Sequence, residues 1–544
     1  MTNIKKYHLH LISFLGGLLL SAAWPERGFA PLLFIGFIPF LFIEDYILRY
    51  REQFSRFSVF FYAYPGFLLW NVLTTWWIWN STSFGSILAW LLNSLFMAAT
   101  LTLFHLTRRE ITKGSNQLML VFFWVMFEYW HHNWEGTWPW LSLGNGLAHW
   151  HKWIQWYEYT GIFGGTLFIL LINILIYKSI QHYIDKKNLY RILLPSCIAA
   201  LTILLATSQS CRLYHKHQEP SRPIDIIVLQ PNIDPYNEQY SLHPSEILNI
   251  NFDLALLKMD EKVEFVVSPE SAIQENIWED RLEDSYSLDT LSAFLKRNPH
   301  TGYVIGASTF RNYGPGEKLP PTARKYRHSE GYYDAYNTAI YLTSTDELTL
   351  HHKSKLTPGV EKMPFARIMK PLENLALDLG GTVGSLGTDP ERTVFTRPDD
   401  GLKIAPVICY ESVFGEYVTE YIKKGANLIF VITNDGWWGD TPGHRQHFTF
   451  SRLRAIETRR SIARSANTGI SAFIDQRGDA FQVTKYWEPD VIRQTINAND
   501  QMTFYVRYGD YIGRLSSFVA IFLILIAMSF RLKRKKRRPI AFED

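Results

Sequence analysis

The sequence predicts a membrane protein of eight transmembrane helices, with one α/β domain inserted between the seventh and eighth helices. Three observations lead to this fold class. Long apolar segments fill residues 1–207 and return at 511–530; basic residues mark every second loop between them; and short β-branched runs alternate with amphipathic stretches from Ser221 onward. The mean hydropathy of −0.07 therefore averages two unlike parts. At 544 residues the chain is long enough to hold both.

Eight apolar segments approach the length of about 20 residues that a helix needs to cross a bilayer. They lie at 8–24, 29–47, 57–79, 84–106, 117–130, 159–180, 191–207 and 511–530. We therefore expect a seven-helix transmembrane domain over 1–207, a catalytic domain over 221–508, a C-terminal transmembrane helix over 511–530 and a basic tail over 531–544.

The positions of lysine and arginine predict the orientation, because these residues are retained on the cytoplasmic side. Lys5 and Lys6 precede the first segment, and Arg49, Arg51 and Arg56 follow the second. Arg108, Arg109 and Lys113 follow the fourth, and Lys178, Lys186, Lys187 and Arg191 lie between the sixth and the seventh. The run from Arg531 to Arg538 follows the eighth. We expect both termini in the cytoplasm and residues 221–508 outside, on the periplasmic face of a bacterial inner membrane. A cleaved signal peptide is the alternative for the first segment, but the alternation holds with the helix retained.

Charge and cysteine content exclude several function classes. The formal net charge is +4 and the C-terminal run supplies +7, so the rest of the chain carries −3 and offers no general surface for nucleic acid. The basic run is better explained as a membrane anchor facing anionic lipid. Three cysteines exclude a disulfide framework. His444 and His447 have a spacing that suits a metal, but no third ligand accompanies them, and we expect no metal or other cofactor.

The segment after Ser221 predicts a layered α/β domain. Strands are expected at 225–230, 265–268, 303–308, 338–342, 402–410, 428–433 and 470–475, and helices at 245–259, 288–297, 413–423 and 445–465. Wholly apolar strands separated by helices indicate a sheet that helices cover. The arginines of the last helix are expected to form a solvated or ion-paired face: Arg452, Arg454, Arg459, Arg460 and Arg464.

Three strand ends carry residues suited to acyl chemistry. Cys409 ends one apolar strand, Glu270 follows another, and the segment after 348 holds Lys353 and Lys355. A nucleophilic thiol needs a base to take its proton and a cation to stabilise negative charge. Each residue taken alone also has an ordinary explanation: a buried small side chain, a strand-terminal carboxylate and a surface lysine.

The ordered set resembles the nitrilase superfamily, whose members use a Glu base, a Lys and a nucleophilic Cys on an αββα sandwich. Together with seven helices before the domain and one after it, the chain is similar to the membrane-embedded apolipoprotein N-acyltransferases. The resemblance implies that Glu270 is the general base, Lys353 the triad lysine and Cys409 the nucleophile. Lys353 is preferred to Lys355 because the family places its lysine eight positions before an essential glutamate, here Glu361. Tyr410 and Glu411 are then further active-site residues.

The resemblance also implies the reaction. A fatty acyl group passes from a membrane phospholipid to Cys409 as a thioester, and then to the N-terminal amine of the diacylglyceryl-cysteine of an apolipoprotein, with ping-pong kinetics. We expect a monomer that contacts membrane lipids and no nucleic acid. Two segments depart from the family pattern: Gln230-Pro231-Asn232 and Pro358-Gly359-Val360-Glu361. The alternatives are an amidohydrolase that gives its acyl group to water, and a transporter or scaffold with a degenerate domain.

Overall fold

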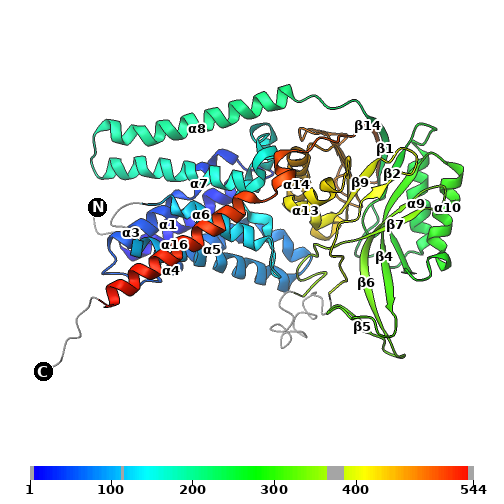
Figure 1. The fold of residues 1–544 in the computed structure, drawn as a ribbon, viewed down its shortest axis with the longest axis horizontal. Helices are drawn as coiled ribbons and strands as arrows, with labels where there is room; N and C mark the ends of the chain where they lie inside the picture. Colours follow the sequence, from blue (N-terminus) through cyan, green and yellow to red (C-terminus); the bar gives the residue numbers. More distant parts are fainter. Residues whose placement is uncertain (1–4, 112–115, 364–384, 537–544) are drawn as a thin grey trace. The chain divides into compact units, whose positions relative to one another are not determined.

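The computed structural model describes residues 5–111, 116–363 and 385–536 (Figure 1). The chain divides into two compact units. The helical unit comprises Met1–Trp76, Ile87–Arg212 and Asp510–Asp544, and the sandwich unit comprises Trp77–Ser86 and Leu213–Gly509. Of the basic residues used for orientation, Lys113, Arg537 and Arg538 lie outside the described residues.

The helical unit is built from apolar helices. They are α1 (Lys6–Ala23), α2 (Leu33–Gly36), α3 (Ile38–Arg49), α4 (Ser58–Thr75), α5 (Ser83–Ile111), α6 (Met119–His131), α7 (Tyr157–Ile184), α8 (Leu189–Lys216) and α16 (Tyr511–Lys536), with 3₁₀ turns at Ala30–Leu32, Pro139–Leu141 and Leu143–Trp153. Within the described residues, five stretches are long and apolar enough to cross a membrane: Ala30–Arg49, α5, α7, α8 and Tyr511–Arg534. The other three predicted segments form α1, α4 and α6, so the count of eight spans stays a prediction.

Small residues let two of these helices approach closely. A Cβ atom added at Gly17 of α1 would lie 2.3 Å from the Gly66 carbonyl oxygen of α4. The Gly66 amide donates to the Ser13 hydroxyl over 3.0 Å. Close backbone approach of this kind is how helices associate where no water is present to drive them together.

A buried ionic cluster joins α3 to α5. Arg108 donates to Glu44 and, over 3.0 Å, to Asp45, and its side chain is 2 % exposed. The sequence placed Arg108 in a loop after the fourth apolar segment, but α5 continues to Ile111 and holds the arginine inside the helical unit. The carboxylates explain why this cation is tolerated there, because buried charges require partners.

The sandwich unit contains two sheets. The first has the order β14-β1-β2-β4-β6-β5, with β3 beside β4 and β7 beside β6; the second has the order β13-β12-β11-β10-β9-β8. The first sheet comprises β1 (Pro223–Gln230), β2 (Phe265–Val267), β3 (Ile273–Trp278), β4 (Gly302–Tyr313), β5 (Arg324–Lys325), β6 (Tyr332–Leu342), β7 (Leu348–His352) and β14 (Asp490–Asn497). The second comprises β8 (Phe395–Thr396), β9 (Lys403–Ile408), β10 (Leu428–Thr433), β11 (Ile462–Ala466), β12 (Ala472–Ile474) and β13 (Ala480–Phe481).

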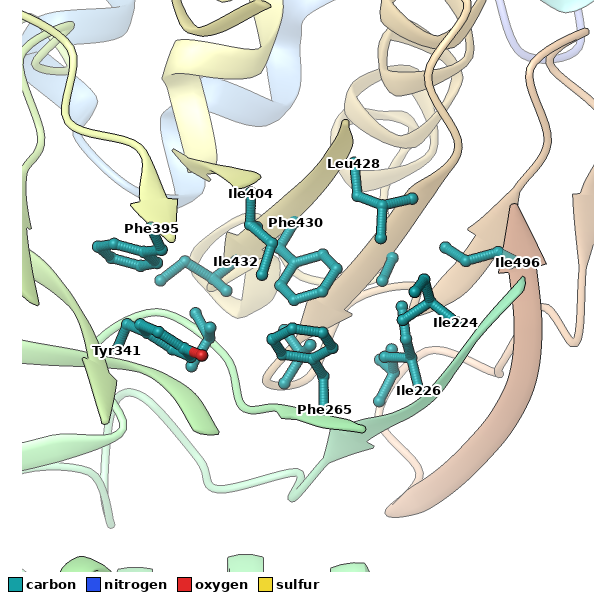
Figure 2. Close-up of a cluster of buried hydrophobic side chains, with 14 of the residues drawn as sticks. Ile224, Ile226, Phe265, Tyr341, Phe395, Ile404, Leu428, Phe430, Ile432 and Ile496 are labelled. Atoms are coloured by element: carbon teal, nitrogen blue, oxygen red, sulfur yellow. The ribbon is translucent and has the colours of Figure 1, made fainter. Parts of the chain in front are cut away.

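Side chains from both sheets meet in one apolar core (Figure 2). Phe265 of β2 packs edge-on against Phe430 of β10, with ring centroids 5.4 Å apart. Along β1, residues 224, 226 and 228 face this core, whereas 227 and 229 face α9 (Pro244–Leu256) and α10 (Tyr286–Arg297). The predicted α/β layering is thus confirmed, and apolar side chains occur on both faces of β1 because both faces are covered.

One predicted helix is wrong after Thr458. The helix expected at 445–465 is α14 (Pro442–Thr458), and β11 follows it as a parallel partner of β10. Arg459 ends the helix with a left-handed backbone, φ 51°. The arginines expected on a solvated face are instead buried: Arg454, Arg460 and Arg464 are at most 1 % exposed. Arg454 pairs with Glu457 and Arg464 with Asp435, so the ion-paired alternative holds for these two. The helix predicted at 413–423 is α13 (Gly415–Lys423).

Candidate active site

Cys409 lies at a sharp turn between β9 and the 3₁₀ turn η7 (Cys409–Val413). Its φ of 48° is left-handed, a conformation that a residue other than glycine adopts rarely and that recurs at functional sites. The residue is 8 % exposed. Burial, and after it the charge of Glu270, raises the pKa of the Cys409 thiol well above its usual value. The thiol is therefore protonated at neutral pH.

Glu270 and Lys353 follow the ends of β2 and β7 and meet beside the thiol. The Lys353 ammonium donates to Glu270 over 2.9 Å and to Glu361 over 2.8 Å. Burial lowers the pKa of Lys353, but the charges of Glu270 and Glu361 outweigh it and raise that pKa well above the usual value. Burial raises the pKa of Glu361, and the Lys353 charge outweighs it, so the pKa is lowered. The lysine is a permanent cation between two carboxylates.

Lys355, the other lysine of this segment, lies elsewhere. Its ammonium sits 4.7 Å from the centroid of the Phe414 ring, a cation–π contact. Burial, together with Lys362 and Arg392, lowers its pKa. The geometry therefore brings Lys353, and not Lys355, to Glu270 and Glu361.

Glu411 connects the two chain segments that carry Lys353 and Cys409. One of its carboxylate oxygens accepts from the Ser354 amide over 2.7 Å, and the other accepts from the Ile408 amide over 2.9 Å. Tyr417 also donates to it. Its backbone contacts are to the residues next to Lys353 and Cys409, so Glu411 ties these two segments together. Tyr410 is 3 % exposed and packs edge-on against Phe414, with centroids 5.2 Å apart.

Sequence reasoning missed Asn337, which lies in β6. Its side-chain amide donates to Glu270 over 2.7 Å and to Glu361 over 3.0 Å. Its backbone carbonyl accepts from the backbone N–H of Lys353 over 2.8 Å. The backbone N–H of Asn434 donates to the other carboxylate oxygen of Glu270 over 2.9 Å. No motif signals Asn337, because its role comes from the pairing of β6 with β7.

A second buried group lies behind Cys409. Single ligand atoms of Cys409, Asp435 and His447 all lie within 4.8 Å of one another, so these residues could hold a metal ion. Arg464 already donates to Asp435 over 2.7 Å. The two ring nitrogens of His447 lie 2.9 Å from Asp435 and 3.1 Å from the Cys409 carbonyl. These contacts occupy the Asp435 and His447 side chains and tie them to the Cys409 backbone, which holds the turn in place.

A cavity of about 520 Å³ opens over these residues. Its lining includes Glu270, Lys353, Glu361 and Cys409, together with Ser81, Tyr240, Arg324, Trp437 and Trp438. Ser81 comes from the Trp77–Ser86 segment of the sandwich unit. The apolar segment expected at 57–79 stops earlier than predicted, since α4 ends at Thr75. Asn80 then donates to the Trp438 carbonyl over 2.8 Å and holds this wall of the cavity.

The sequence matches known protein families and named relatives. The carbon-nitrogen hydrolase family matches residues 220–502, more than half of the sequence. The chain belongs to that family. Residues 16–175 match the apolipoprotein N-acyltransferase N-terminal domain. Full-length relatives carry the same name: the apolipoprotein N-acyltransferase of Chlorobaculum tepidum is 28% identical, and that of Geobacter metallireducens 27%, each over 96% of both chains. The predicted resemblance is confirmed.

Proposed function

We propose that the protein is an apolipoprotein N-acyltransferase that carries a fatty acyl group on Cys409 from a membrane phospholipid to the N-terminal amine of diacylglyceryl-cysteine. One observation carries the proposal: a buried thiol at a left-handed turn shares a cavity with a carboxylate and a permanently charged lysine. The names of relatives that align over 96% of the chain support the acceptor. The helices long and apolar enough to cross a membrane support a lipid donor.

In the first half-reaction, Glu270 takes the thiol proton as the sulfur attacks the ester carbonyl carbon. Lys353 stabilises the tetrahedral oxyanion, together with a backbone N–H near Tyr410. The ester C–O bond then breaks, and the lysophospholipid oxygen receives the proton from Glu270. Because the pKa of the thiol is raised, its proton leaves only as the new bond forms.

In the second half-reaction, the acceptor amine attacks the thioester. Glu270 takes a proton from the nitrogen, the C–S bond breaks and the proton returns to the sulfur, so Cys409 is regenerated. Asn337 and the Asn434 amide keep Glu270 aligned for both transfers, since each donates to one of its oxygens. Glu361 keeps Lys353 beside Glu270.

The proposal includes the full topology. Eight spans, cytoplasmic termini and a periplasmic catalytic domain over 221–508 would bring Cys409 to the side of the inner membrane where lipoproteins mature. The boundaries proposed for the other parts remain 1–207, 511–530 and 531–544. We propose a monomer that uses the phospholipid and the apolipoprotein in turn and needs no cofactor.

The test is the intact mass of the purified protein after incubation with phospholipid. We expect a fatty-acyl adduct on the native chain that hydroxylamine removes, and no adduct on Cys409→Ala. Cys211→Ala is the matched control and keeps the adduct, because Cys211 lies in α8 of the helical unit. An adduct that persists in Cys409→Ala would overturn the proposal.

The amidohydrolase alternative also deserves a test, because the name of the matching family describes hydrolases, which transfer the acyl group to water. The two activities differ in the product that accompanies lysophospholipid. An acyltransferase releases it in proportion to acylated lipoprotein, and a hydrolase in proportion to free fatty acid.

A further inference from the structure

Two cations line the active-site cavity in the described part of the chain, Lys353 and Arg324. Lys353 is paired with two glutamates. Arg324 forms no ion pair with any acidic residue that the structure describes, and its hydrogen bond goes to the Ser385 carbonyl over a long 3.5 Å. A guanidinium has five N–H donors, and the Ser385 contact uses one of those that the described residues could engage.

The sheet holds Arg324 at a set distance from the reactive residues. Arg324 of β5 lies opposite Tyr333 of β6, and Asn337, which contacts Glu270 and Glu361, is four residues further along β6. Four strand residues span about 13 Å. Positions 333, 335 and 337 share one face of the strand, and the cavity lining includes Ala335 and Asn337 of that face together with Tyr336. The arginine is therefore a second cationic point on the wall that carries Asn337.

The charges along this wall differ in sign. At one end, Glu270 and Glu361 flank the single Lys353 cation, so an additional anion is disfavoured there. At the other end, Arg324 offers a cation without a described acidic partner. An amphiphile that carries both an anion and an ester would thus be oriented with its anion at Arg324. Guanidinium binds phosphate oxygens in a bidentate manner, which adds direction to the attraction.

We propose that Arg324 binds the phosphodiester of the acyl donor and so directs the ester carbonyl of a glycerophospholipid toward Cys409. The assignment rests on the proposed function. The long arginine side chain and the glycerol backbone together bridge the separation along β6. Arg324 would thereby make the enzyme select acyl donors that carry a phosphodiester over neutral esters.

The test compares two donors on full-length protein in detergent micelles: phosphatidylglycerol, and the neutral ester p-nitrophenyl palmitate. The readout is the rate of acyl-enzyme formation as a function of donor concentration. For Arg324→Gln we expect the KM for phosphatidylglycerol to rise about tenfold or more, as for a lost charge-assisted hydrogen bond. The rate with the neutral ester stays within about twofold. Arg324→Lys retains part of the selectivity, because it keeps the charge without the bidentate geometry.

Arg311→Gln is the matched control, since Arg311 is exposed and pairs with Glu317 over 3.3 Å. It leaves both rates unchanged. Equal losses on both donors for Arg324→Gln, or no loss on either, would overturn the assignment. In a separate arm, strong inhibition by inorganic phosphate that Arg324→Gln abolishes would assign the site to free phosphate and overturn the donor assignment. Absence of any adduct on the native protein with phosphatidylglycerol would instead overturn the proposed function itself.

Discussion

The residues around Cys409 place one lysine cation between two carboxylates before any substrate arrives. Lys353 is held as a cation between Glu270 and Glu361, and Cys409 is held as a neutral thiol by burial. A thiol in this state is a weak nucleophile, which protects it from side reactions. In the mechanism that we propose, it becomes reactive when Glu270 accepts its proton during attack.

The titration of Cys409 tests this description. In a chain carrying Cys197→Ser and Cys211→Ser, we expect ultraviolet thiolate absorbance to appear only above pH 9, because burial and Glu270 raise the pKa of the thiol. Adding Glu270→Gln removes a negative charge that opposes the thiolate, so the titration moves to lower pH. The same chain with Cys409→Ala is the blank. A thiolate already present at pH 7 would contradict the expected direction.

At the scale of elements, strand ends and short turns place the functional groups, and a buried network fixes the turns. Arg464 of β11 donates to Asp435 in the 3₁₀ turn Asp435–Trp438, and His447 of α14 lies between Asp435 and the Cys409 carbonyl. The network thus joins a strand, a turn and a helix directly behind Cys409. Its members are fully buried, so each charge depends on its partner.

Loss of one partner is therefore costly. We expect Arg464→Met to lower the free energy of unfolding by about 3–5 kcal/mol, because the buried Asp435 carboxylate loses the guanidinium that pairs with it. Thermal unfolding of the detergent-solubilised protein measures the effect. Arg445→Met is the control: Arg445 pairs with Asp440, which is 67% exposed, and such pairs contribute at most about 1 kcal/mol. Equal shifts for the two variants would show that the network is not stabilising.

At the scale of the whole molecule, the chain leaves its apolar helices twice to build the sandwich unit. The long excursion, Leu213–Gly509, carries the sheets, and the short one, Trp77–Ser86, carries part of the cavity wall. The indole rings of Trp77 and Trp438 lie with centroids 4.8 Å apart. The segment that connects α4 to α5, with the first residues of α5, thus belongs to the same unit as Cys409.

The predicted orientation can be tested on one helix. Cys211 lies near the end of α8 and is exposed, and Lys186 lies in the turn before its start. In spheroplasts that make the chain with Cys197→Ser and Cys409→Ala, we expect an impermeant maleimide to label Cys211 from outside. A chain with Cys211→Ser and Lys186→Cys should react only after permeabilisation, because positive loops are retained in the cytoplasm. The reverse pattern would place the sandwich unit inside the cell and contradict the topology.

Some elements were predictable because their signal is local. The strand predicted at 428–433 is β10, since a continuous apolar run buried on both faces has no other place in the fold. The helix predicted at 445–465 is right as far as Thr458 and wrong beyond it, because an arginine-rich pattern does not distinguish a buried, ion-paired segment from a solvated one. Arg459 turns left-handed, and Arg464 pairs with Asp435, 29 residues earlier in the chain.

The sequence by itself determined the apolar helices, the layered α/β domain and the residue types of a thiol acyltransferase, because hydrophobic period and residue chemistry are local properties. Only the tertiary structure decided that Lys353 meets two glutamates, that Asn337 joins them, and that Arg324 and the Trp77–Ser86 segment line the same cavity. These contacts arise from strand pairing and from the return of distant segments to one cavity. No property of a residue's neighbours in the chain encodes them.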